Sequence, residues 1–122
     1  MEDQVQEVSK ALGFLVKNAT GLGFDGERVI LMGHSSGAHV VTLLGTDTSY
    51  LEHTGVDIHI IRAIISIDGS NYNALAEIMD SPGPVAQSTA CGLGFDPKRL
   101  RAMSPTYHAR GPSAQAFLFL HA

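Results

Sequence analysis

The first half of the chain contains one segment in which apolar residues recur periodically and two segments that are almost continuously apolar. These predict a helix, a strand and a second helix. The first helix is indicated by apolar residues at steps of three and four, namely Val5, Val8, Leu12 and Leu15. We expect it to stop at 18–21, and we expect the continuous apolar run 29–32 to form a strand covered on both faces. Residues 36–45 are apolar almost all round, which predicts a helix inside the core.

The second half repeats this alternation. The apolar runs 60–67 and 116–120 predict two more strands, and 73–79 predicts a short helix that Pro82-Gly83-Pro84 breaks. Asp96-Pro97 is typical of a helix start and opens a helix through Met103. Helices and strands that alternate in this order predict an α/β fold, with a parallel sheet of about three strands and flanking helices. Such a thin sheet has two exposed edges, so we also expect self-association through them.

Length and composition limit the number of domains and the classes of partner that the chain can have. With 122 residues the chain is one domain at most. Its net charge is -4 and it has no run of basic residues, so nucleic acid is not expected as a partner. No apolar stretch is long enough to span a membrane, and the acidic start Met1-Glu2-Asp3 is unlike a signal peptide, which favours the cytoplasm for the chain as given. The single cysteine, Cys91, is expected to be a buried or half-buried thiol.

The segment Gly33-His34-Ser35-Ser36-Gly37 carries the candidate chemistry, because it matches the G-x-S-x-G nucleophile elbow of serine hydrolases. It lies between a predicted strand and a predicted helix, which is the setting that the elbow requires. Glycines on both sides of the serine let strand and helix approach closely. We therefore predict that Ser35 is the nucleophile. The backbone N–H of Ser36, at the start of the helix, is predicted to face the developing oxyanion.

Gly-His-Ser-Ser-Gly-Ala-His followed by an apolar helix resembles the carboxylesterase-type α/β hydrolases, including their feruloyl-esterase-like and kynurenine-formamidase-like groups. The likeness covers nearly the whole chain. The other segments that carry it are 24–28, Asp68-Gly69, Asp96-Pro97, Met103-Ser104-Pro105, Tyr107-His108-Ala109 and the strand that ends at Leu120-His121. The resemblance implies hydrolysis of a small-molecule ester or amide through an acyl-enzyme, with no cofactor.

The resemblance also implies where the remaining catalytic groups belong. In such hydrolases the acid follows the strand that ends here at His121-Ala122, and the histidine follows the acid. We therefore expect residues 1–122 to be the central part of an α/β-hydrolase domain, or a truncated relative, without the N-terminal strands and the acid and histidine segment. A non-catalytic fragment or pseudoenzyme that binds a ligand or partner chain is the alternative.

Other residues in the chain could also carry chemistry. Asp68 ends a strand, where some lipase-like relatives place their acid, and six histidines could complete a triad with it and Ser35. Those histidines stand at positions 34, 39, 53, 59, 108 and 121. His34 and His39 favour packing or hydrogen-bonding roles, and the resemblance gives His121 a pocket-shaping role. The spacing of His34 and His39 is not that of a helical zinc pair, so no metal is expected. The basic residues 98, 99, 101 and 110 indicate a solvated face.

Overall fold

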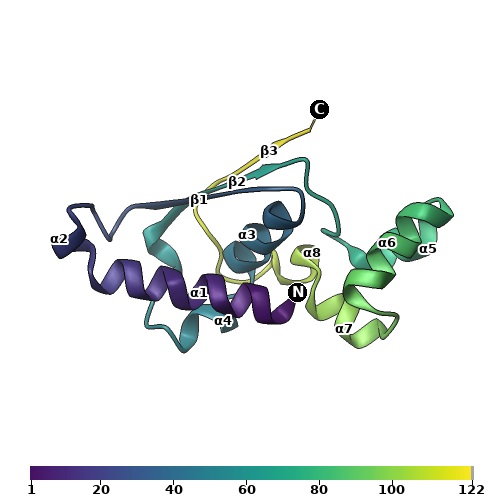
Figure 1. The fold of residues 1–122 in the computed structure, drawn as a ribbon, viewed down its shortest axis with the longest axis horizontal. Coiled ribbons are helices and arrows are strands. Elements are labelled where there is room, and N and C mark those ends of the chain that lie inside the picture. Colours follow the sequence, from purple (N-terminus) through teal and green to yellow (C-terminus); the bar gives the residue numbers. More distant parts are fainter. Residues whose placement is uncertain (122) are drawn as a thin grey trace.

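The computed structural model of the protein describes residues 1–121, and its centre is a three-stranded parallel sheet (Figure 1). The strands are β1 (Val29–His34), β2 (Ile61–Ile67) and β3 (Phe117–Leu120), and they lie in the order β1-β2-β3. Both neighbouring pairs are parallel. The predicted α/β class and the three predicted strands are confirmed. Residue 122, the last of the predicted domain, lies outside the described residues.

Helices cover one face of this sheet. Helix α3 (Ser36–Thr46) packs against β1 and β2, and α1 (Glu2–Lys17) packs against α3 from the other side (Figure 1). Every residue of α3 from 38 to 46 is buried, which confirms the prediction of a core helix. An apolar surface all round suits a helix that is enclosed by a sheet and other helices.

Helix α1 buries a different stripe from the predicted one. Val5 and Leu12 are buried as expected, but Leu15 is 44% exposed and Val8 is 36% exposed. Ser9 takes the intervening buried position, where its hydroxyl donates a hydrogen bond to the carbonyl of Tyr50. A buried hydroxyl with a partner costs little, so the helix accommodates a polar residue in the core. The helix ends near the predicted stop, and a one-turn helix α2 (Ala19–Leu22) follows at once.

The segment between β2 and β3 contains more helix than the sequence predicts. Helices α5 (Ala74–Asp80) and α7 (Pro97–Ala102) confirm the two predicted helices, and the Asp96 carboxylate caps α7 by accepting from the backbone N–H groups of Lys98 and Arg99. The predicted break at 82–84 is confirmed, because α5 ends at Asp80, but a second helix that was not predicted, α6 (Gly83–Leu93), begins there. Proline favours a first helical turn, where its missing N–H has no partner to lose.

Three short elements complete the fold. Helix α8 (Pro105–His108) also begins at a proline, while α4 (Ser49–Glu52) and the 3-10 helix Ile58–Ile60 lie between α3 and β2. The unit of α5, α6 and α7 stands to one side of the sheet, beyond the end of β2 (Figure 1). Within residues 1–121, no helix is long and apolar enough to cross a membrane.

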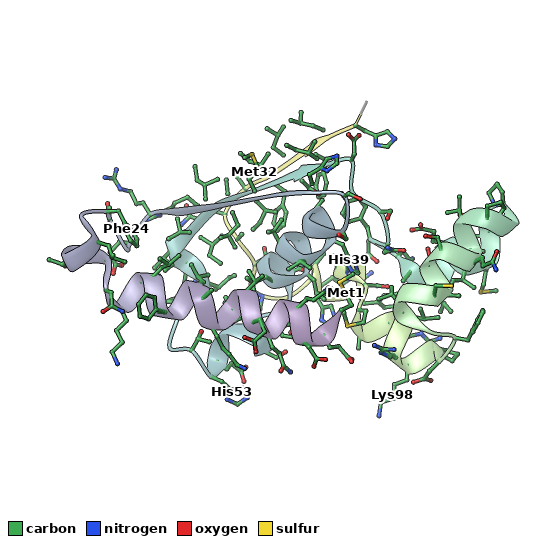
Figure 2. The ribbon with its side chains drawn as sticks, in the orientation of Figure 1. Met1, Phe24, Met32, His39, His53 and Lys98 are labelled. Carbon is green, nitrogen blue, oxygen red and sulfur yellow. The ribbon has the colours of Figure 1, made fainter. Side chains whose placement is uncertain are left out.

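The other face of the sheet is open, which corrects the prediction that β1 is covered on both faces. Ile30 and Met32 are 60% and 66% exposed, whereas Val29 and Leu31 point toward the helices and are half-buried. Met32 points away from α1 and α3 (Figure 2). The apolar run alone could not separate the two cases, because it reports hydrophobicity and not which helices lie above each side of the strand.

Candidate active site

Ser35 occupies a strained turn between β1 and α3. Its backbone has φ 54° and ψ -120°, outside the regions that residues with a side chain normally adopt. The strand ends one residue earlier and the helix begins one residue later, at Ser36. Ser35 and Ser36 are both exposed. A conformation of this kind is retained where surrounding structure holds it, and such positions cluster at functional sites.

Backbone hydrogen bonds hold the turn in place. The N–H of Ser35 donates to the carbonyl of Ile67 at 2.9 Å, which ties the turn to the end of β2. The carbonyl of Ser35 accepts from the N–H of Ala38 at 3.0 Å and from that of His39 at 3.3 Å, so it starts the hydrogen-bonding pattern of α3. The serine side chain therefore stands at the N-terminal end of a buried helix, where the backbone carries partial positive charge.

Gly33 is required by the close approach of the strand to the helix. A Cβ built on Gly33 would lie 2.2 Å from the carbonyl oxygen of Gly37, a distance that real Cβ atoms do not reach. The predicted need for glycine is confirmed here. It is wrong for Gly37, where an added Cβ would meet nothing within 4 Å.

Asp68 lies between two imidazole rings at the same edge of the sheet. It follows β2 directly, has φ 47°, and its N–H donates to the carbonyl of Leu120 at 2.8 Å. Its carboxylate lies 3.3 Å from Nδ1 of His121 and 3.8 Å from Nε2 of His34. The ends of three parallel strands thus bring Ser35 and its neighbour His34, Asp68 and His121 to one edge, as expected of a site at the carboxyl ends of strands.

The remaining histidines lie elsewhere. His39 is fully buried, its Nε2 lies 2.7 Å from the carbonyl of Met103, and burial lowers its pKa. The predicted packing role of His39 is confirmed, whereas His34 has a largely exposed side chain. His53 ends α4, His59 is in the 3-10 helix and His108 is paired with Asp47. Of the six histidines, His121 and His34 are therefore the two whose position next to Asp68 and the elbow suits a role in the candidate active site.

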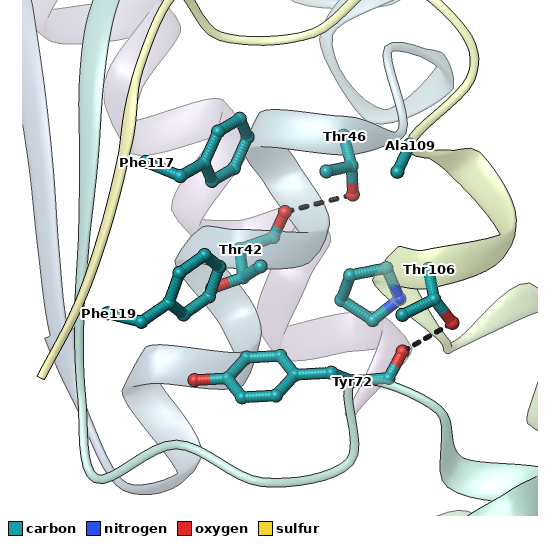
Figure 3. A pocket seen from close by; sticks show the side chains of 8 residues that line it. Thr42, Thr46, Tyr72, Thr106, Ala109, Phe117 and Phe119 are labelled. Atoms are coloured by element: carbon teal, nitrogen blue, oxygen red, sulfur yellow. Dashed lines mark hydrogen bonds between the residues drawn. The ribbon is translucent and has the colours of Figure 1, made fainter. Parts of the chain in front are cut away.

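Two hollows flank the strands. One has a volume of about 580 Å³ and includes Gly33, Ser36 and Gly37 of the elbow, together with Gln4 and Val8 of α1. The other has about 480 Å³ and lies between α3, α8 and β3 (Figure 3). In the second, the hydroxyls of Thr42, Thr46 and Thr106 donate to backbone carbonyls, which leaves an apolar wall. Of these two hollows, the first is the one that residues of the elbow line.

The residues considered for metal binding, for an anionic ligand or as a thiol do not form a second site in the described part of the chain. No group of three or more metal-ligating side chains occurs within residues 1–121. Among the basic residues, Arg99 lies 3.4 Å from the carboxylate of Glu2 and donates to the carbonyl of Leu93. Its guanidinium therefore makes contacts within the protein, in addition to those with solvent that the sequence predicts. Cys91 is exposed, which corrects its expected burial, because it lies on the outer side of the unpredicted helix α6.

Asp68 and the six histidines were considered as an alternative triad, but the sequence did not identify His34 and His121 as the rings that face Asp68. The available signal was that each residue stands at the end of an apolar strand run, since the carboxyl ends of parallel strands meet at one edge. Which imidazole nitrogen faces the carboxylate depends on backbone and side-chain geometry that the pattern does not contain.

The parallel sheet with helices between its strands, and a serine on a strained strand-to-helix turn, define an α/β-hydrolase type of protein. The chain belongs to the BD-FAE family, a feruloyl-esterase-like α/β-hydrolase domain family whose model matches residues 1–90. This match includes Ser35, Ser36 and Asp68. Comparison with curated proteins and with solved structures found no match to the chain. Family membership supports an esterase-type hydrolase.

Proposed function

We propose that this protein is a serine hydrolase that cleaves a small-molecule ester or amide through Ser35. The observation that carries the proposal is the backbone of Ser35, with φ 54° and ψ -120° between a strand and a buried helix. An exposed serine held in a strained turn at a helix N-terminus is arranged for nucleophilic attack and for stabilisation of the charge that follows.

In the proposed reaction, Oγ of Ser35 attacks the carbonyl carbon of the substrate and loses its proton to a histidine. The N–H of Ser36 donates to the oxyanion of the tetrahedral intermediate, which collapses to an acyl-enzyme as the protonated alcohol or amine leaves. Water then attacks the acyl-enzyme and releases the acid. The reaction needs no cofactor.

Within residues 1–121, we assign the acid–base role to Asp68 and His121. A carboxylate that faces Nδ1 of an imidazole fixes the tautomer and leaves Nε2 for the serine proton. His121 presents Nδ1 to Asp68 at 3.3 Å, whereas His34 presents Nε2 at a longer distance. The acyl group is assigned to the hollow of about 580 Å³ beside the elbow. Ile30 and Met32 give that hollow an apolar wall.

The proposal is tested with a fluorophosphonate, which forms a covalent bond to an activated serine oxygen and loses fluoride. Intact-mass measurement of the folded chain should detect one adduct, and Ser35→Ala should detect none. Ser36→Ala is the matched control, because it removes a neighbouring hydroxyl and keeps the backbone N–H; it should label as the wild type does. A folded wild-type chain without an adduct contradicts the proposal and favours the non-catalytic alternative.

A further inference from the structure

The side chain of Tyr72 contacts both of the strands whose ends carry Asp68 and His121. Its hydroxyl forms a hydrogen bond of 2.6 Å with the hydroxyl of Ser66, which is fully buried in β2 two residues before Asp68. Its ring meets the ring of Phe119 edge to face, with centroids 5.2 Å apart (Figure 3). Phe119 is in β3, two residues before His121, and is the register partner of Ser66. Tyr72 therefore contacts β2 and β3 just before the two candidate catalytic side chains.

The turn after Asp68 is packed against the same phenol. A Cβ built on Gly69 would lie 2.1 Å from the hydroxyl oxygen of Tyr72 and 2.9 Å from the Cβ of Ala38 in α3. The backbone of this turn therefore lies directly against both residues, at a distance that only glycine permits. The turn also contains two residues with positive φ, 47° at Asp68 and 62° at Asn71. Such conformations persist only where the surrounding structure holds them.

The main chain of Tyr72 and of the residue before it is attached to three helices. The carbonyl of Tyr72 accepts from the N–H of Thr106 in α8 at 3.1 Å and from its hydroxyl at 2.9 Å (Figure 3). Asn71 donates its N–H to the carboxylate of Glu77 in α5 at 2.7 Å. The hydroxyl of Thr89 in α6 donates to the side-chain oxygen of Asn71 at 2.8 Å. The phenol is therefore held both at its backbone and at its hydroxyl.

We propose that Tyr72 is a positioning residue that holds the carboxylate of Asp68 against Nδ1 of His121, an inference that rests on the proposed role of this pair. The hydroxyl of Tyr72 fixes β2 just before Asp68, and the ring fixes β3 just before His121. Catalytic groups tolerate little displacement, because a shift of about 1 Å costs up to about 100-fold in rate. Side chains that support a catalytic pair in this way act through its geometry and not on the substrate.

The rate of fluorophosphonate labelling at Ser35 tests this proposal. Tyr72→Phe keeps the ring and removes the hydroxyl, and it should label roughly 10-fold more slowly than the wild type. Ser66→Ala removes the other half of the same hydrogen bond and should reproduce this loss, so the test does not depend on one variant. Tyr50→Phe is the matched control, because it also removes the hydroxyl of a half-buried tyrosine, which donates to Sδ of Met103 at 3.7 Å from helix α4. It should label at the wild-type rate.

A double-mutant cycle distinguishes positioning from a general effect on the fold. If Tyr72 acts through Asp68, then Tyr72→Phe should cause almost no further loss in an Asp68→Asn background, because the carboxylate that it holds is already gone. A general effect on the fold would multiply the two losses. An unchanged labelling rate in Tyr72→Phe and Ser66→Ala, or losses that multiply in the double variant, overturns this inference and leaves the proposed function in place. A folded wild type without an adduct overturns the proposed function and this inference with it.

Discussion

Nδ1 of His121 lies 3.3 Å from a carboxylate oxygen of Asp68, and the backbone of the two segments is joined by the bond from the Asp68 N–H to the Leu120 carbonyl. Asp68 holds φ 47°, a left-handed conformation that costs a residue with a side chain about 1 kcal/mol. The two strand ends are therefore fixed to each other, and the orientation of the imidazole follows from that attachment.

This relationship predicts that the reactivity of Ser35 depends on both residues. His121→Gln removes the base, and Asp68→Asn removes the charge that orients it, so each should slow fluorophosphonate labelling by roughly 100-fold to 10⁴-fold. Asparagine suits the Asp68 position because it tolerates the left-handed conformation. The measurement is the rate of adduct formation followed by intact mass.

The control for these variants is His53→Gln, which removes an exposed histidine at the end of α4 and should label at the wild-type rate. Labelling that is lost in Ser35→Ala but unchanged in His121→Gln would keep Ser35 as the nucleophile and reject His121 as its base. The assignment of Ser35 as nucleophile and the assignment of His121 as base can therefore be contradicted separately.

A second prediction concerns the glycine before the elbow. Gly33→Ala places a methyl group 2.2 Å from the Gly37 carbonyl oxygen, and backbone atoms on both sides leave little room for adjustment. We expect a loss of about 3 kcal/mol in the free energy of unfolding, as for an overpacked core position. Urea unfolding followed by circular dichroism measures it.

Gly37→Ala is the matched control, because the same methyl group meets nothing within 4 Å and lies in helix α3. Alanine in a helix is favoured over glycine by up to about 1 kcal/mol, so this variant should be as stable as the wild type or more stable. Equal destabilisation by both substitutions would show that the close approach of strand and helix is not what requires Gly33.

The elements predicted correctly are those whose local pattern decides their structure. The strand at 61–67, the buried helix after Ser35 and the capped helix after Asp96 each carry a signal within a few residues. Helix α6 was missed because Pro82-Gly83-Pro84 is compatible both with a break and with a helix start. Only the packing of α6 against α5 selects the second.

The candidate site likewise has a part that the local sequence determines and a part that depends on the tertiary fold. The elbow motif is local, so Ser35 and its strained turn follow from five consecutive residues. The contact between Asp68 and His121 joins positions 53 residues apart, and it depends on strand order and register. The open side of β1 was likewise beyond prediction, since burial of Met32 depends on which elements lie above the sheet.

His39 predicts a dependence of stability on pH. Burial lowers its pKa, so the folded protein favours the neutral ring, whose Nε2–H donates to the Met103 carbonyl. The unfolded chain binds a proton near the ordinary value of about 6.5. The contribution of His39 is therefore complete above that pH, and it decreases as the pH falls from about 6.5 toward the lower folded value. Urea unfolding from pH 7.5 to 5 should show declining stability.

His39→Gln removes this titration while it keeps an N–H donor of similar reach, so its stability should fall less over the same pH range. His53→Gln, at an exposed position, should follow the wild-type curve. If His39→Gln and the wild type decline in parallel, some other group causes the acid sensitivity.

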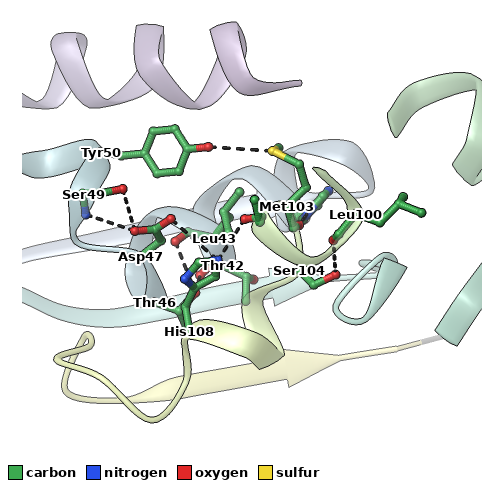
Figure 4. A network of polar contacts seen from close by, with 12 residues as sticks. Thr42, Leu43, Thr46, Asp47, Ser49, Tyr50, Leu100, Met103, Ser104 and His108 are labelled. Carbon is green, nitrogen blue, oxygen red and sulfur yellow. Dashed lines mark hydrogen bonds and ion pairs between the residues drawn. The ribbon is translucent and has the colours of Figure 1, made fainter. Parts of the chain in front are cut away.

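The last prediction concerns Asp47, which joins three elements at the end of α3 (Figure 4). One carboxylate oxygen accepts from the backbone N–H and the hydroxyl of Ser49, at 3.1 and 2.7 Å. The other lies 3.7 Å from Nε2 of His108 in α8, and both side chains are mostly buried. Asp47→Ala removes both contacts and should cost about 1 to 2 kcal/mol in the free energy of unfolding.

Asp57→Ala is a matched control, because Asp57 makes the same local bond to the N–H of His59 at 2.9 Å from an exposed position. It should cost about 0.5 to 1 kcal/mol, the value of a capping contact alone. A double-mutant cycle of Asp47→Asn and His108→Gln then isolates the ion pair, for which we expect a coupling of up to about 1 kcal/mol. Zero coupling would assign the whole effect of Asp47 to the turn at Ser49, and α8 would then be held without the ion pair, by contacts such as those of His108 with the Ala102 carbonyl and of Thr106 with the Tyr72 carbonyl.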